Sequence, residues 1–104
     1  MNNPYRGMKF KSEPDYKMYQ VSFLPSAEKQ FLKLDKIIQK QLQEYINTNL
    51  NNTDNPRRYG KALKGKFKGL WRYESGNYRL VCNIHDNIVQ ILIVKIGHRK
   101  NIYK

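Results

Sequence analysis

The sequence has little cysteine and histidine: one cysteine, Cys82, and two histidines in 104 residues. A single cysteine excludes an internal disulfide and any cysteine-rich metal site. Chains without disulfides are typical of reducing compartments, so we expect a cytoplasmic protein. No histidine lies in a sequence cluster of carboxylates, as a zinc or calcium site would require. We therefore predict no metal and no cofactor.

The sequence also lacks a long hydrophobic run. The longest apolar stretch, IVQILIVKI (88–96), is interrupted by Gln90 and Lys95 and is far too short to span a bilayer. Residues 1–13 contain no apolar segment typical of a secretory signal. Walker loops, GxGxxG loops and Ser/His/Asp arrangements are absent as well. We expect neither membrane association nor the nucleotide-dependent or serine-hydrolase classes.

Acidic residues are nearly missing from the second half of the chain. Residues 57–104 contain 12 Lys or Arg but only Glu74 and Asp86, a net charge of +10, whereas residues 1–56 carry +2. Charge concentrated in this way attracts polyanions and releases their counterions on binding. A generally basic protein without such a partner is the simpler alternative. A membrane-surface role is disfavoured, because no basic amphipathic helix is evident.

The first half predicts a leader, a strand and a helical hairpin. Residues 1–17 show no sustained periodicity and are interpreted as a flexible leader to a domain over 18–104. Residues 18–24 alternate as a half-buried strand does. Pro25 and Ser26 then suit a helix start, and Asp35 begins a second helix whose apolar stripe continues to Leu50. So short a connection predicts that the helices are antiparallel.

The second half predicts a basic loop followed by three strands. Strands are expected at 70–75, 78–85 and 88–96, with a tight hairpin turn at Asp86 and Asn87. The last strand is apolar on both faces, which is typical of an interior position. The fold class is therefore α+β: an N-terminal strand, a helical hairpin, and a three-stranded antiparallel meander with the helices on one sheet face.

Two arginines should lie close together in the meander. The hairpin joining 70–75 to 78–85 brings Arg72 near Arg79, and two guanidinium groups repel unless an anion lies between them. A phosphate suits that position through bidentate hydrogen bonds. The alternative is that each arginine pairs with Glu74, Asp86 or solvent.

The segment after the last strand contains His98, Arg99 and Tyr103. Histidine transfers protons readily near neutral pH, and tyrosine can stack on a base or carry a proton. RNA supplies its own nucleophile, the 2′-hydroxyl, so cleavage needs only a base, cations for the phosphate and an acid. These residue types therefore favour metal-independent RNA cleavage.

Three motifs resemble the RelE/ParE toxin superfamily, in particular its RelE-type messenger-RNA interferases: LKG (63–65), GLWRYESGNYRLV (69–81) and IGHRKNIY (96–103). The resemblance implies a helical hairpin on a curved, mainly antiparallel sheet. It also implies a type II toxin that enters the ribosomal A site, cleaves messenger RNA there, and is neutralised by a cognate, RelB-like antitoxin.

The resemblance assigns roles to particular residues. Arg79 matches the catalytic arginine, Arg99 a second arginine, Tyr103 the C-terminal tyrosine, and Arg72 the place of a catalytic lysine or arginine. His98 stands where members carry histidine or lysine. The cations expected to support RNA binding are Lys64, Lys66, Lys68, Lys100 and Lys104.

Leu70 and Glu74 depart from the family pattern, because basic residues are common at both places. The general base is left open between His98, Tyr103 and a neutral lysine. Two other functions also remain open: a ParE-like inhibitor of DNA gyrase, and a catalytically weak homologue that only binds antitoxin or nucleic acid.

Overall fold

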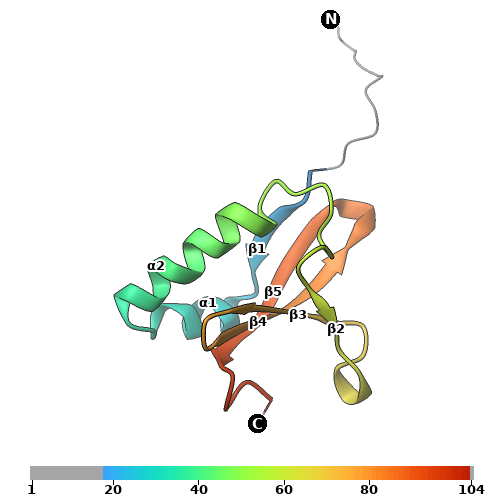
Figure 1. Ribbon diagram of the computed structural model, residues 1–104. Coiled ribbons are helices and arrows are strands. Elements are labelled where there is room, and N and C mark those ends of the chain that lie inside the picture. Colours follow the sequence, from blue (N-terminus) through green and yellow to red (C-terminus); the bar gives the residue numbers. More distant parts are fainter. Residues whose placement is uncertain (1–17, 104) are drawn as a thin grey trace, which may run out of the picture.

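A computed structural model describes residues 18–103 of the chain (Figure 1), so the predicted leader and Lys104 lie outside the described residues. Two helices accompany a five-stranded sheet of strand order β1-β5-β4-β3-β2, which confirms the α+β class. The elements are β1 (Gln20–Phe23), α1 (Pro25–Leu32), α2 (Lys36–Tyr45), β2 (Lys61–Ala62), β3 (Trp71–Ser75), β4 (Tyr78–His85) and β5 (Gln90–His98).

The helices form the predicted hairpin. Pro25 occupies the first turn of α1, where its missing N–H leaves no hydrogen bond unmade. Beyond α2 the chain continues as a π-helical segment, Ile46–Leu50, in which the Asn51 N–H donates to the Ile46 carbonyl at 2.8 Å. The buried side chains Leu42, Ile46 and Leu50 follow the predicted apolar stripe. Among residues 18–103, no helix is long and apolar enough to cross a membrane.

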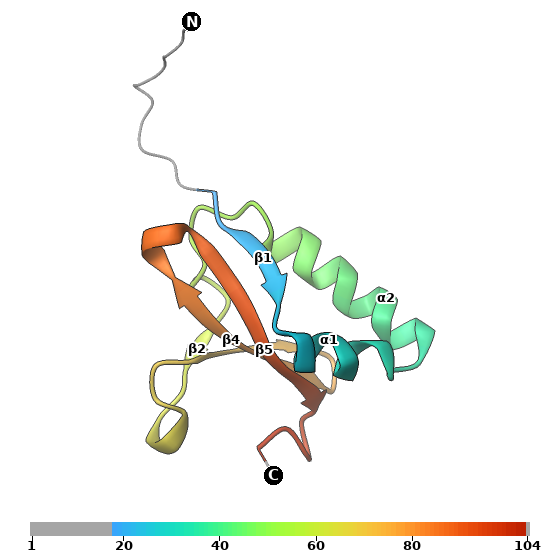
Figure 2. The same ribbon diagram turned by 180° about the vertical axis from the view of Figure 1, so that it is seen from behind.

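Both helices cover the same face of the sheet (Figures 1 and 2). The core between these layers contains Tyr73, Leu80, Cys82, Ile91 and Ile93, all fully buried. Burial raises the pKa of the Cys82 thiol, which keeps the side chain neutral. Because side chains alternate along a strand, the neighbours of these residues in β3 and β4 face away from the helices.

The first strand completes the sheet from one edge. β1 pairs with β5 in parallel, with Gln20 opposite Gln90 and Phe23 opposite Ile93, whereas the other strand pairs are antiparallel. β5 therefore lies between β1 and β4, in the interior position predicted for the apolar last strand. The short strand β2, at the other edge, falls within the segment predicted to be a basic loop.

The predicted tight turn at Asp86 and Asn87 is wrong. A 3-10 turn occupies Asp86–Ile88, Val89 has left-handed backbone (φ 54°), and β5 starts only at Gln90. The wider turn holds the Asp86 carboxylate between two distant partners. Arg57 donates to both of its oxygens, at 3.1 and 2.8 Å, and the Tyr19 hydroxyl donates to it at 2.7 Å. Such long-range partners cannot be deduced from the local turn sequence.

Candidate functional site

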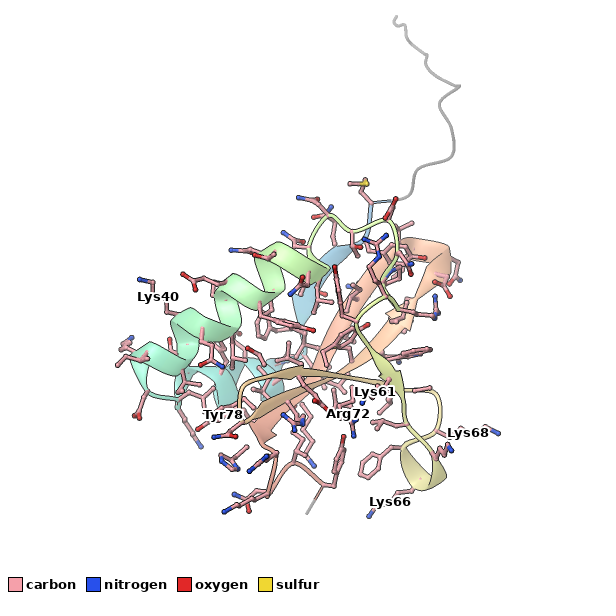
Figure 3. The ribbon with its side chains drawn as sticks, viewed as in Figure 1. Lys40, Lys61, Lys66, Lys68, Arg72 and Tyr78 are labelled. Carbon is pink, nitrogen blue, oxygen red and sulfur yellow. The ribbon has the colours of Figure 1, made fainter. Side chains whose placement is uncertain are left out.

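The register of the sheet builds a row of cations on the face opposite the helices. Lys61 on β2 lies opposite Arg72 on β3, Arg72 opposite Val81 on β4, and Val81 opposite Lys95 on β5. Directly opposed residues in antiparallel strands share a face. Figure 3 shows Lys61 and Arg72 next to each other where β2 meets β3. Three of the four positions in this row are therefore basic.

Glu74 lies between the two predicted arginines. Its Oε2 atom is 2.9 Å from Nη2 of Arg72 and 3.7 Å from Nε of Arg79. The hairpin thus brings the arginines together as predicted, and the anion between them is a carboxylate of the chain itself. This arrangement corresponds to the alternative in which the guanidinium groups pair with Glu74.

The two arginines differ in how they are held. Arg79 is nearly covered, with 14% of its side chain exposed, and its Nη1 donates to the carbonyls of Gly76 and Tyr78 at 3.1 Å each. These bonds fix the guanidinium against the β3–β4 turn. Within the described residues, Arg72 has no comparable backbone partner, and its Nε is buried without a hydrogen-bond acceptor. Arg79 is therefore pre-positioned, whereas Arg72 keeps an unused donor.

The tail after β5 folds back over the open face. Ile102 is 2% exposed, and its Cδ1 would lie 3.2 Å from a Cβ atom added to Gly97, so the tail packs closely on the strand. The Arg99 N–H donates to the Asn77 carbonyl at 2.8 Å, which ties the tail to the β3–β4 turn. Tyr103 then packs against Phe67 of the β2–β3 loop, with ring centroids 5.2 Å apart, and its buried hydroxyl has no hydrogen-bond partner in the part of the chain that the structure describes.

His98 belongs to the other side of the sheet. It lies opposite Tyr78, whose ring packs against the helix-covered core, and the two rings meet edge to face at 5.4 Å. Its Nδ1 accepts a hydrogen bond from the Lys100 N–H at 3.1 Å, which requires that nitrogen to be unprotonated. The strand alternation thus separates His98 from Arg72 and Arg79.

The predicted lysines divide between two segments. Lys64, Lys66 and Lys68 lie in the β2–β3 loop, where Lys66 is over the Phe67 ring (5.4 Å) and Lys68 points away from the sheet (Figure 3). Lys100 is exposed in the tail, and Lys104 is outside the described residues.

Sequence reasoning missed Lys61, Lys95 and Phe67. Lys95 interrupts an otherwise apolar strand, and Phe67 interrupts a run of lysines and glycines; both irregularities were signals of a second, exposed face. Among residues 18–103, no three His, Cys, Asp or Glu side chains form a group that could hold a metal ion.

Comparison with known proteins gives consistent matches. The family model described as "ParE toxin of type II toxin-antitoxin system, parDE" matches residues 21–103. Toxin RelG of Mycobacterium tuberculosis is 30% identical over 86 residues, which cover 83% of this chain and 97% of RelG.

Solved structures also resemble the chain. The toxin–antitoxin complex RelBE2 of M. tuberculosis contains a chain with a TM-score of 0.72 and 29% identity, covering 79% of this protein and 99% of that chain. A chain of the intact Escherichia coli RelBE toxin–antitoxin complex matches with a TM-score of 0.63 and 26% identity, covering 77% and 95% respectively. The family match over residues 21–103 contains both helices and the four positions of the cation row.

Proposed function

Because this chain belongs to the RelE/ParE superfamily of type II toxin–antitoxin toxins, we propose that it is an endoribonuclease that cleaves messenger RNA in the ribosomal A site. Two unused donors in the site carry this proposal. Within residues 18–103, the buried side-chain polar atoms without a hydrogen-bond partner are Arg72 Nε and the Tyr103 hydroxyl.

An unpartnered buried donor costs about 1–3 kcal/mol, so it is retained where a ligand supplies the acceptor. Both donors belong to residues that the sequence motifs assign to the site. The oxygens of a phosphate can accept from a guanidinium and from a phenol together, and such charge-assisted bonds are strong. A phosphodiester between Arg72, Arg79 and Tyr103 would satisfy both groups.

In the proposed reaction, RNA cleavage needs no external nucleophile. The 2′-hydroxyl oxygen attacks the adjacent phosphorus, the bond from phosphorus to the 5′-oxygen breaks, and the products are a 2′,3′-cyclic phosphate and a 5′-hydroxyl. Negative charge grows on the phosphoryl oxygens during attack, where Arg72, Arg79 and Arg99 would stabilise it. Tyr103 would donate the proton that the 5′-oxygen needs, with a neutral lysine or His98 as the base that takes the 2′-hydroxyl proton. In the alternative assignment, Tyr103 would be that base and another group the acid.

Glu74 has to yield its place to the substrate. A carboxylate and a phosphate compete for the same two guanidinium groups and repel each other at this distance. The side chain is 41% exposed, so it can turn into solvent without breaking the core. In the free protein it would keep two neighbouring arginines from repelling, and the arriving phosphate would take over that role.

A cognate antitoxin is part of the proposal. The RelBE2 and E. coli RelBE chains that resemble this protein were solved as toxin–antitoxin complexes. We propose a RelB-like antitoxin that offers a helix or an extended acidic segment to the basic face. Ribosome and messenger RNA would be the other partners, and all of them point to function in the cytoplasm.

The test is to induce the chain in cells and to map transcript ends. Wild-type protein should arrest growth and cut within translated codons. Arg79→Ala should reduce cutting by at least about a hundredfold, since a donor to the transition state is lost. Glu74→Gln removes the competing charge and should retain or increase cutting. Lys40→Ala, on α2 away from the cation row (Figure 3), is the matched control and should cut normally.

Other outcomes would replace this proposal. DNA damage without transcript cleavage would identify a ParE-like inhibitor of DNA gyrase. Normal growth with neither transcript cleavage nor DNA damage would identify a homologue that only binds antitoxin or nucleic acid. Full cutting by Arg79→Ala would reject the assigned site even if the chain is toxic.

A further inference from the structure

Phe67 occupies an unusual place for a large apolar side chain. It lies in the β2–β3 loop, in a 3-10 turn over Gly65–Phe67, flanked by Lys66 and Lys68. The core between helices and sheet does not include it. Instead its ring meets that of Tyr103 at 5.2 Å with a tilt of 51°, and Tyr103 carries one of the two donors proposed to hold the scissile phosphate.

Two ammonium groups are arranged around this ring. Nζ of Lys66 lies 5.4 Å from the ring centroid, and Nζ of Lys95, from β5, lies 6.0 Å from it. An aromatic surface next to cations is the combination that binds a single-stranded nucleotide: the base stacks on the ring and the phosphate pairs with the cations. Among residues 18–103, no carboxylate forms an ion pair with Lys66 or Lys95.

Open space surrounds the two glycines on either side of Phe67. Gly65 and Gly69 both have left-handed backbone, with φ of 65° and 98°, and no heavy atom of residues 18–103 lies within 4 Å of a Cβ atom added to either. Glycine adopts this backbone without strain, and the open space leaves room for the loop to shift. Figures 1 and 2 show the loop projecting from the sheet below β2.

Building on the proposed function, we propose that Phe67 is a nucleobase platform. It would stack on a base adjacent to the scissile phosphate and so position that phosphate between Arg72, Arg79 and Tyr103, with Lys66 and Lys95 contacting the neighbouring backbone. Phe67 is thus a positioning residue that acts through substrate binding, and the ligand class is an unpaired ribonucleotide within the A-site codon.

The test measures single-turnover cleavage by the full chain on ribosomes programmed with a defined codon, as a function of toxin concentration. The codon is intact, or it has one base removed at each position in turn. Phe67→Ala should raise the half-saturating concentration about tenfold or more on the intact codon, the range expected for a lost stacking contact. Phe67→Trp should restore it. Tyr59→Ala, at an aromatic that is 53% exposed outside the site, is the matched control.

Removal of the stacked base is the decisive arm. On that abasic codon, wild type and Phe67→Ala should have equal half-saturating concentrations, because the contact is already missing. The proposal would be overturned if Phe67→Ala kept the same raised half-saturating concentration, relative to wild type, on every abasic codon. Wild-type behaviour of Phe67→Leu would also overturn it, because leucine fills the same space without an aromatic face and would reduce the role to packing on Tyr103.

Two outcomes separate this inference from the function on which it rests. If wild type cuts, Arg79→Ala does not, and Phe67→Ala behaves as wild type, the platform is rejected and the endoribonuclease stands. If wild type does not cut programmed ribosomes, both are rejected. Weaker antitoxin binding by Phe67→Ala with unchanged cleavage would assign the ring to the antitoxin interface and overturn the platform.

Discussion

At the residue scale, the unprotonated Nδ1 of His98 holds the turn that leads into the tail. It accepts from the N–H two residues later, which is the bond that an asparagine side chain makes in an Asx turn. The ring also contacts Tyr78 on the helix-covered side of the sheet, away from the arginines. This geometry favours a positioning role for His98 over that of proton carrier.

Replacement of His98 by asparagine separates the two roles. His98→Asn preserves an acceptor for the Lys100 N–H but has no group that titrates near neutral pH. We expect cleavage within about threefold of wild type and an unchanged pH–rate profile, whereas His98→Ala should be weaker because the turn loses its acceptor. Loss of one ionisation from the profile of His98→Asn would instead make His98 the base.

The residues of the site were partly predictable. Arg72 and Arg79 could be placed together because strand alternation and a short turn fix which side chains are neighbours. The occupant between them could not, since Glu74 lies on the same strand as Arg72 and its direction depends on a rotamer. His98 was assigned to the site by its motif, although its face depends on the irregularity in register between Val81 and Cys82.

At the scale of elements, the proposed site depends on two segments outside the sheet and the two helices. The β2–β3 loop supplies Phe67 and three lysines, and the tail supplies Arg99 and Tyr103. They meet through the contact between Phe67 and Tyr103 over the open face of the sheet. The anchor of the tail is Ile102, which is 2% exposed and packs on Gly97, where an added Cβ atom would lie 3.2 Å from the Ile102 Cδ1 atom.

Ile102→Ala should therefore affect activity more than stability. Loss of a buried isoleucine costs about 2 kcal/mol or more, and here the tail that places Tyr103 loses its anchor. We expect cleavage to fall at least about tenfold at a temperature where the protein remains folded. Ile91→Ala, in the core between helices and sheet, is the control. It should lower the free energy of unfolding, measured with urea, at least as much as Ile102→Ala does, while cleavage by the folded protein stays normal.

Elements with strong periodicity were predicted correctly, and those held by distant contacts were not. The two helices and the strands β3 and β4 follow from apolar patterns within single segments. β2 is only two residues long and exists because Lys61 and Ala62 meet β3. The turn before β5 is set by Tyr19 and Arg57, which lie far away in the sequence. The sequence of a single segment does not indicate such distant partners.

At the scale of the whole molecule, the core includes phenols that resist ionisation. Burial raises the pKa of Tyr45 from 10.0 to about 12, and burial also raises the pKa of Tyr73, whose hydroxyl donates to the Pro56 carbonyl. In the unfolded chain these groups lose their protons near their ordinary values. The free energy of unfolding therefore falls as the pH rises from about 10 towards 12. Below pH 10 the tyrosines are protonated in both states, and their contribution to stability is fully present.

The change Tyr45→Phe tests this expectation. Its phenyl ring cannot ionise, so the variant should lose about 1–2 kcal/mol less unfolding free energy than wild type between pH 9 and pH 12, a value reduced for the partial exposure of Tyr45. Urea unfolding at both pH values provides the measurement. Equal losses in the two proteins would show that Tyr45 does not couple ionisation to folding.

The parallel pairing of β1 with β5 also fixes when the molecule can assemble. Gln20 is synthesised early and pairs with Gln90, which is synthesised seventy residues later. Contacts across so much sequence form slowly, and until β5 exists, β1 and the helices have no complete sheet to pack on. The cation row needs the same strand, because Lys95 is part of it. A nascent chain on the ribosome therefore carries Arg72 and Arg79 before it has the complete sheet on whose open face they lie.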